Sequence, residues 1–138
     1  MDKISKEKRS WNMSRIRSKD TKPEKLLRSR LHKLGYRFRL HSKNLPGKPD
    51  IVFSKFKTVV FVHGCFWHGH NCSFAHMPKS NTAFWQNKIE INKKRDKKRT
   101  RQIKSAGWNS VVVWECQIHK MLDKVVSKVK NKFIYDIN

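Results

Sequence analysis

Acidic residues are scarce in this chain, whose 138 residues include only 10 Asp and Glu against 33 Lys and Arg, for a net charge of +23. The deficit restricts carboxylate chemistry and any hard-cation site to a few side chains. The excess of cations is spread over nearly the whole chain and predicts a polyanionic partner, most commonly nucleic acid. A membrane partner is disfavoured, because it requires cations aligned on one face of an amphipathic helix.

Long apolar segments are also absent. The longest run, Val59 to Val62, is too short to span a bilayer, and the charged segment Met1 to Arg9 is not followed by the apolar stretch of a signal peptide. We therefore expect a cytoplasmic protein with reduced thiols. The chain has only three cysteines, so a Cys65–Cys72 disulfide with Cys116 unpaired is the alternative that this compartment disfavours.

The length fits a single domain, which we place at residues 21–138 after a basic N-terminal arm at 1–20. The arm is either a solvated tail or a segment that forms a short helix on nucleic acid. A capping box beginning at Thr21 predicts a helix that ends at Gly35, with an apolar stripe on one face. The leucines of that stripe are Leu26, Leu27, Leu31 and Leu34.

Hydrophobic patterning in the rest of the domain predicts four strands and two further helices. The strands are expected at 36–40, 51–53, 58–62 and 111–114, with a turn at 45–49 and the third strand central in its sheet. A long helix capped by Asn81 is expected over 82–105, and a single amphipathic helix over about 118–129. This order predicts an α/β fold with a mixed sheet flanked by helices.

Thiol and imidazole groups of the kind zinc prefers gather in the loop after the third strand. A closed tetrahedral site would take four of them: Cys65, His70, Cys72 and Cys116. Such a site would tie this loop to the end of the last strand, and we expect it to be structural. His63 or His68 could replace His70 as the imidazole ligand.

Two carboxylates are candidates for chemistry. Asp50 lies between the turn at 45–49 and an apolar strand, where it could fix Mg²⁺ against a phosphodiester or simply cap the turn. The capping box by itself accounts for Glu24. His63 and His68 can each transfer a proton at neutral pH.

Aromatic and basic side chains are candidates for contacts with a duplex. Phe66, Trp67 and Trp85 would ordinarily be core residues, but an aromatic wedge can also unstack DNA, most easily at a mispair. The basic run at 93–101 predicts a helix face that contacts phosphates. Its candidate residues are Lys93, Lys94, Arg95, Lys97 and Lys98.

Several of these segments together resemble the very short patch repair, or Vsr, DNA mismatch endonucleases. The resemblance covers about residues 9–118 in collinear order and rests on RSWNMSRIRSKDTKPE (9–24), LPGKPDIVF (45–53), VFVHGCFWHGHNC (60–72), the pair 84–85 and VVVWEC (111–116). It implies a relative of the type II restriction endonucleases with a structural zinc site. It also implies a bacterial enzyme that acts on the nucleoid and nicks DNA next to T:G mispairs left by 5-methylcytosine deamination.

The resemblance also assigns roles to individual residues. It implies that Asp50 binds the catalytic Mg²⁺ with the backbone carbonyl of Val62, where the best-known member has threonine. It implies that His68 is catalytic, with His63 and Glu24 in supporting positions. The zinc ligands match Cys65, His70, Cys72 and Cys116, and the intercalating aromatics match Phe66, Trp67 and Trp85. The arm is expected to approach DNA from the other groove through Arg9, Met13 and Arg15.

We therefore predict a monomeric, Mg²⁺-dependent nicking endonuclease that is specific for T:G mispairs in double-stranded DNA and functionally linked to a cytosine methyltransferase. A non-catalytic, zinc-stabilised DNA-binding protein is the first alternative. A hydrolase that uses the zinc ion for chemistry is another, but a fourth ligand at Cys116 would close its open position. An RNA-binding role leaves Asp50 and the aromatic loop unexplained.

Overall fold

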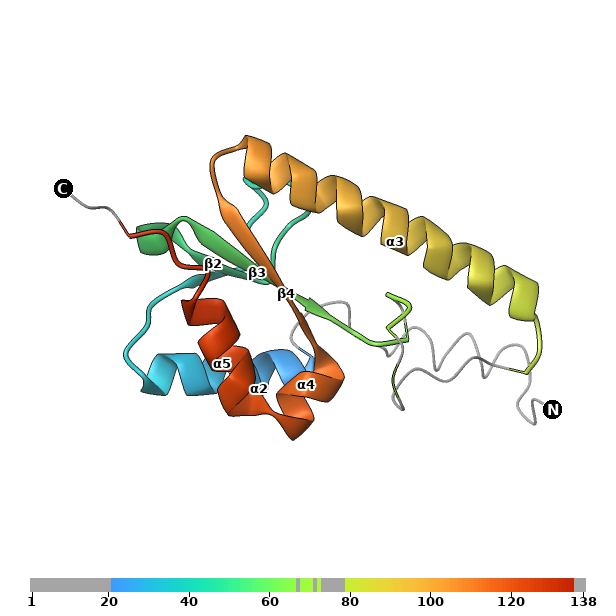
Figure 1. Ribbon diagram of the computed structural model, residues 1–138, viewed down its shortest axis with the longest axis horizontal. Coiled ribbons are helices and arrows are strands. Elements are labelled where there is room, and N and C mark those ends of the chain that lie inside the picture. Colours follow the sequence, from blue (N-terminus) through green and yellow to red (C-terminus); the bar gives the residue numbers. More distant parts are fainter. Residues whose placement is uncertain (1–20, 67, 71, 73–78, 136–138) are drawn as a thin grey trace.

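A four-stranded mixed sheet in the order β1–β2–β3–β4 organises the chain (Figure 1). The computed structural model describes residues 21–66, 68–70, 72 and 79–135. The strands are β1 (Arg39–Leu40), β2 (Ile51–Phe53), β3 (Thr58–His63) and β4 (Asn109–Trp114). β2 is antiparallel to both β1 and β3, whereas β3 and β4 are parallel. The predicted α/β class with a mixed sheet is therefore confirmed.

Helices cover both faces of this sheet. On one face lie α2 (Lys22–Lys33), α4 (Glu115–Lys120) and α5 (Leu122–Lys130), and α3 (Thr82–Ser105) runs along the other (Figure 1). A 3₁₀ turn, η1 (Ser54–Phe56), joins β2 to β3. The central position predicted for β3 is confirmed, because it pairs with β2 on one side and β4 on the other.

The alternation of side chains along β2 and β3 builds two hydrophobic layers. Ile51, Phe53 and Val60 join the larger core under α2, α4 and α5, whereas Val59 and Phe61 join the smaller core under α3. Fully burying a side chain of this size stabilises the fold by about 1.5–3 kcal/mol. The sheet is thereby fixed from both faces, and its strand ends form a rigid edge.

The start and end of α2 follow the sequence prediction. The Thr21 hydroxyl accepts a hydrogen bond from the Glu24 N–H at 3.5 Å. At the other end Gly35 adopts φ +96°, and the Tyr36 N–H bonds to the Leu31 carbonyl, which gives a Schellman-type stop. The predicted apolar stripe is wrong in part: Leu27 and Leu31 are buried, but Leu26 and Leu34 are 39% and 53% exposed.

The predicted strand at 36–40 is wrong over its first three residues, because only Arg39 and Leu40 pair with β2. The residues just before them make hydrogen bonds to the end of α2 and within their own segment instead. The Tyr36 N–H donates to Leu31, and the Arg37 side chain donates to the carbonyls of His32 and Tyr36. The alternating pattern reflects partial burial of Tyr36 and Phe38 against the core.

Two helix predictions also need correction. The single C-terminal helix is divided into α4 and α5 at Met121, whose backbone leaves the helical region at φ −144° and ψ 51°. The break lets both short helices pack on α2. Asn81 precedes α3 as predicted, but it has φ 55°, and its side chain makes no capping hydrogen bond.

The predicted N-terminal arm lies outside the described residues. None of the helices in the described part of the chain is long and apolar enough to cross a membrane.

Candidate active site

Three strand ends meet at one edge of the sheet. β3 and β4 run parallel, so His63 and Trp114 lie side by side at their carboxyl ends. β2 runs the other way, so Asp50, which precedes it, reaches the same edge and donates its N–H to the Val60 carbonyl. Ligands bind at such carboxyl ends in many α/β proteins.

A cavity of about 870 Å³ opens at this edge. Its ionisable lining consists of three carboxylates, three imidazoles and five cationic side chains: Glu24, Asp50, Glu115, His41, His63, His68, Lys43, Lys48, Lys88, Arg95 and Arg99. Acids and imidazoles that converge in one basic hollow are suited to chemistry on an anionic substrate.

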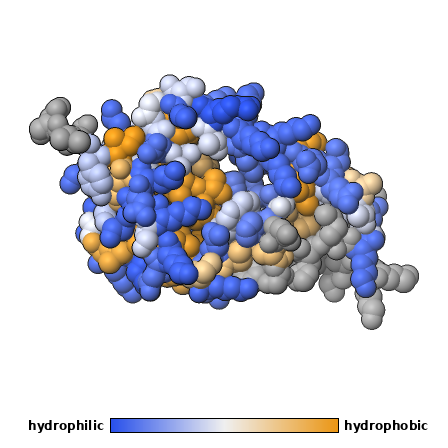
Figure 2. All heavy atoms as spheres, viewed as in Figure 1, coloured by the Kyte–Doolittle hydropathy of each residue, from blue (hydrophilic) through white to orange (hydrophobic). Residues whose placement is uncertain are grey.

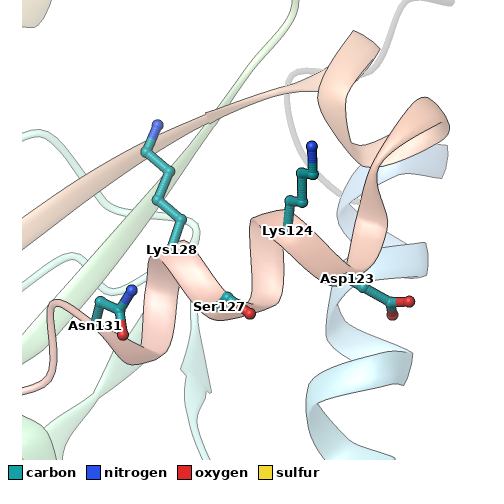
Figure 3. Close-up of a pocket in the computed structure, with 5 residues that line it drawn as sticks. All are labelled: Asp123, Lys124, Ser127, Lys128 and Asn131. Atoms are coloured by element: carbon teal, nitrogen blue, oxygen red, sulfur yellow. The ribbon is translucent and has the colours of Figure 1, made fainter.

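A second, smaller hollow lies on α5 and is a much poorer candidate. Its volume is about 410 Å³, and Figure 3 shows Lys124 and Lys128 extending away from the helix while Asp123 points elsewhere. The Lys128 ammonium donates to the Val112 carbonyl, and Asp123 pairs with Arg30. Lys128 and Asp123 are thus engaged in structural contacts, and the side chains that line this hollow do not converge on a common point.

Asp50 directly precedes β2, and a backbone hydrogen bond from β3 positions its carboxylate. Its Oδ2 accepts a hydrogen bond from the Val62 N–H at 2.7 Å, and its Oδ1 lies 3.8 Å from His41 Nδ1. Burial raises the pKa of Asp50 to about 7 against the lowering effect of the Val62 hydrogen bond, and the nearby Glu24 carboxylate raises it further. A carboxylate in this environment gains from binding a cation.

Glu24 and His41 complete a group around Asp50. Glu24 is only 2% exposed, and its Oε2 lies 3.6 Å from His41 Nε2. Its backbone N–H belongs to the cap of α2, while its carboxylate lines the cavity. The His41 ring lies between the two acids, although its backbone has an unusual φ of 49°. One donor atom from each residue lies within 4.8 Å of the others, and the group could hold a metal ion.

His63, His68 and Asp96 form a second group. The two imidazoles stack at 3.7 Å with 5° between their planes. Asp96 Oδ2 lies 2.5 Å from His68 Nδ1 and 4.0 Å from His63 Nδ1. Burial, followed by the neighbouring His68, lowers the pKa of His63 to about 3, so His63 is neutral at physiological pH. Asp96 fixes the orientation of His68 and leaves its Nε2 available for another partner.

The four cysteine and histidine side chains predicted as zinc ligands also converge. One donor atom from each of Cys65, His70, Cys72 and Cys116 lies within 4.8 Å of the others, and the three thiols are free. The Cys65–Cys72 disulfide is therefore not formed. Burial raises the pKa of Cys65 to about 12, and a coordinated metal would offset this by stabilising the thiolate. Three sulfurs and one imidazole nitrogen suit a tetrahedral ion.

The cysteine group is tied to the rest of the site. His70 stacks on Trp114 at a ring distance of 4.2 Å, and the Cys65 N–H donates to Glu115 Oε1 at 3.1 Å. Both partners lie at the end of β4 or directly after it. The cysteine group and the cavity therefore share one strand edge.

Aromatic side chains link the loop after β3 to the start of α3. The Phe66 and Trp85 rings lie 5.6 Å apart, and Phe84 lies 5.1 Å from Trp85 and is 57% exposed. Phe66 and Trp85 are half-buried. Trp67, predicted to act with them, lies outside the described residues, as do Arg9, Met13 and Arg15 in the arm.

The predicted basic face on α3 is only partly directed toward the cavity. Hydrophilic side chains follow α3 on the face shown in Figure 2. Of the five cations predicted to contact phosphates, Arg95 lines the cavity. The others, Lys93, Lys94, Lys97 and Lys98, lie outside its lining, and the last three are exposed.

Sequence reasoning assigned no role to His41, Asp96 or Glu115. Asp96 had a visible signal, because it is the only acid in the basic run at 93–101. Glu115 directly precedes Cys116 at a strand end. His41 had no comparable signal, because its position depends on the pairing of β1 with β2.

The chain is similar to known proteins over nearly its whole length. Residues 1–74 match the family model described as DNA mismatch endonuclease Vsr, and the Escherichia coli K12 protein of that name is 38% identical over 96% of this chain and 87% of its own length. The chain belongs to the Vsr family.

Other relatives carry names of nicking enzymes. The type II nicking enzyme V.XorIIP of Xanthomonas oryzae pv. oryzae is 51% identical over 85% of this chain and 86% of its own length. The type II nicking enzyme V.NmeAIP of Neisseria meningitidis is 46% identical over 94% of this chain and 97% of its own length. The predicted resemblance to the Vsr family is thus confirmed over nearly the whole chain.

The raised pKa of Asp50 predicts how its replacement alters stability. Between about pH 4 and pH 7 the folded chain keeps a proton on Asp50 that the unfolded chain has released, so this group makes stability fall as pH rises through that window. The Asp50→Asn variant has no carboxyl group to titrate at this position, but its amide oxygen can still accept the hydrogen bond from the Val62 N–H.

The comparison is the free energy of unfolding of both proteins in urea, without added Mg²⁺. We expect Asp50→Asn to gain stability relative to the unsubstituted protein between about pH 4.5 and pH 8. A difference that stays constant over this range would show that Asp50 ionises normally.

Proposed function

We propose that this protein nicks one strand of double-stranded DNA next to T:G mispairs that arise when 5-methylcytosine deaminates, and so begins very short patch repair. The observation that carries the proposal is the convergence of Asp50 and His68, each with its partners, on one cavity lined by cations. Membership in a family of DNA mismatch endonucleases supports the same reaction class.

Binding to DNA rests on positive charge. The net charge of +23 attracts phosphates over a large surface, and Lys43, Lys48 and Lys88 carry that charge into the cavity. The exposed cations Lys94, Lys97 and Lys98 add contacts that hold the duplex in register without reading its sequence.

Selection of the mispair rests on the aromatic group. Phe66 and Trp85 lie in edge contact beside the cavity, where they could enter a base step together with Trp67. Unstacking costs a few kcal/mol per step and is cheapest at a mispair, so a wedge at this place favours T:G over paired DNA. Arg9, Met13 and Arg15 remain predicted contacts from the other groove.

Asp50 is the residue that we propose to bind Mg²⁺. Its Oδ1 and the Val62 carbonyl would hold the ion, with Glu24 and His41 beside it. A bound Mg²⁺ would act as a Lewis acid on the phosphodiester and lower the pKa of its water. Because the pKa of Asp50 is raised to about 7, binding must displace a proton at lower pH, and affinity should decrease there.

His68 is the residue that we propose to move the proton. Asp96 engages Nδ1, so Nε2 can accept a proton from the attacking water. The water oxygen bonds to phosphorus as one phosphorus–oxygen ester bond breaks, and the departing sugar oxygen takes a proton from solvent. Neutral His63 stacks against His68 without adding a second positive charge.

Zinc is proposed as a structural ion at Cys65, His70, Cys72 and Cys116. The donor set fits, and closing it would join the loop after β3 to the end of β4.

We further propose that residues 21–138 form one restriction-endonuclease-like domain. The mixed sheet, with its acid and imidazole groups at one edge, supports this assignment.

The biological setting follows from the proposed substrate. Cytosine methylation creates the base whose deamination gives a T:G mispair, so we link this protein functionally to a bacterial cytosine methyltransferase. We propose that it works on chromosomal DNA in the cytoplasm. We also propose that it acts as a monomer, because one chain supplies the whole lining of the cavity.

The central test compares a T:G duplex with its T:A counterpart, with and without Mg²⁺. We expect one strand of the T:G duplex to be nicked only when Mg²⁺ is present, and Asp50→Ala to lower the single-turnover rate by about 10³-fold. Asp123→Ala, an exposed acid on α5, is the control and should nick normally. Tight binding without any strand break would instead favour a non-catalytic DNA-binding protein.

Replacing His68 tests the proton-transfer step. His68→Ala should reduce the single-turnover rate by roughly 10²–10⁴-fold, because general base catalysis contributes that much. Asp96→Asn should give a smaller loss, because the imidazole remains but is no longer held. Neither change should alter the Kd for the duplex appreciably, and exposed His32→Gln should leave both quantities unchanged. A full rate in His68→Ala would assign the base to another group.

Replacing Cys116 tests the zinc assignment. We expect acid-denatured protein to release a single zinc ion per chain, measured with a metallochromic dye. Cys116→Ser should release less and should lower the Tm by at least about 5 °C. His119→Gln, on the same short helix, is the control and should retain its zinc. A Cys116→Ser protein that nicks at full rate with bound zinc would point to a catalytic zinc ion instead.

A further inference from the structure

Arg99 lies in the cavity, although the sequence singled out its neighbours instead. It follows Arg95 by one helical turn on α3, and both line the same cavity as Asp50, His63 and His68. Lys97 and Lys98 do not belong to that lining. The position of Arg99 on the helix therefore separates it from the exposed cations of the basic run.

The stem of Arg99 is fixed by the turn that leads into Asp50. Gly47 has φ +77°, and a Cβ built on it would lie 2.9 Å from both Cγ and Cδ of Arg99. Only a residue without a side chain allows this close approach. The turn thus packs directly on the methylene groups of Arg99. Because the same turn leads into Asp50, it helps to position both side chains.

The charge of Arg99 lacks a direct counterion in the described part of the chain. No hydrogen bond or ion pair joins its guanidinium to another described residue. By contrast, Arg95 Nη2 donates to Asn92 Oδ1 at 3.0 Å. Burial and then the charge of Arg95 lower the pKa of Arg99, while the charges of Asp96 and Asp50 oppose this effect. An arginine nevertheless remains charged at physiological pH, and a partly buried cation of this kind favours an incoming anion.

We propose that Arg99 is a catalytic residue that binds the phosphate being cleaved and stabilises the negative charge that develops on its non-bridging oxygens. This inference rests on the proposed nicking function and names a group that acts in its chemical step. The planar guanidinium can donate two parallel hydrogen bonds to a phosphate, which a lysine cannot do. Arg99 forms no covalent bond and keeps its proton throughout.

Its place in the cavity gives Arg99 a role different from that of the exposed cations. A donor held in position before the reaction stabilises the transition state without reorganisation, and removing one such donor commonly costs about 10²–10³-fold in rate. An exposed lysine that contacts a distant phosphate contributes mainly to binding and to its salt dependence. Loss of Arg99 should therefore reduce the rate of cleavage more than the affinity for DNA.

The test measures single-turnover nicking of a T:G duplex at saturating protein, together with the Kd from fluorescence anisotropy. We expect Arg99→Ala to slow nicking by about 10²–10³-fold while the Kd rises less than about tenfold. Arg99→Lys should recover only part of the rate, because it keeps the charge but loses the fork. Lys104→Ala, an exposed cation on the same helix outside the basic run, should match the unsubstituted protein.

Chemical rescue separates a catalytic role from a structural one. Guanidinium chloride, far below denaturing concentrations, should restore part of the rate of Arg99→Ala but none of that of His68→Ala. A collapse of the Tm in both Arg99 variants without rescue would assign Arg99 a packing role and overturn the proposal. An unchanged rate in Arg99→Ala would also overturn it.

The same experiment distinguishes the failure of this inference from that of the proposed function. If the unsubstituted protein fails to nick the T:G duplex in Mg²⁺, the proposed function fails. If that protein nicks the duplex and Arg99→Ala does so equally well, only the role of Arg99 is refuted.

Discussion

The parallel pairing of β3 with β4 is the constraint on which the rest of the site depends. Its register sets His63 beside Trp114, so the loop that follows β3 meets the residues that follow β4. Cys65 then reaches Cys116, and its N–H bonds to Glu115. Without this pairing Cys116, which is more than forty residues from the other three donors in the chain, would have no reason to meet them.

Around that pairing, two acidic side chains lie among cations: Asp50 in the cavity and Asp96 in the basic run. Asp50 is buried enough for its pKa to rise to about 7, yet the Val62 N–H fixes one of its oxygens. Asp96 likewise lies within the basic run and holds His68. Each acid is thus available for a defined task, because backbone or imidazole contacts determine its orientation and the surrounding cations favour a phosphate over a competing acid.

Local patterns in the sequence predicted most elements but not how they join. The capping box and Gly35 bound α2 correctly, because caps depend on a few neighbouring residues. The alternation at 36–40 predicts a strand longer than the two residues that pair, since a half-buried loop can show the same period as a half-buried strand. The division at Met121 carries no glycine or proline signal and results from packing of α4 and α5 on α2.

The sequence by itself determined the residue types of the site: three thiols, a small set of acids and an excess of cations, together with motifs specific enough to identify the family. Tertiary structure alone decided that His41 lies between Glu24 and Asp50 and that Arg99 turns from the basic helix into the lining of the cavity. It also decided that Asp96 reaches the two stacked imidazoles. The physical reason is that chemical identity is local to each residue. Proximity instead depends on strand register and helix rotation, which the packing of the whole chain fixes.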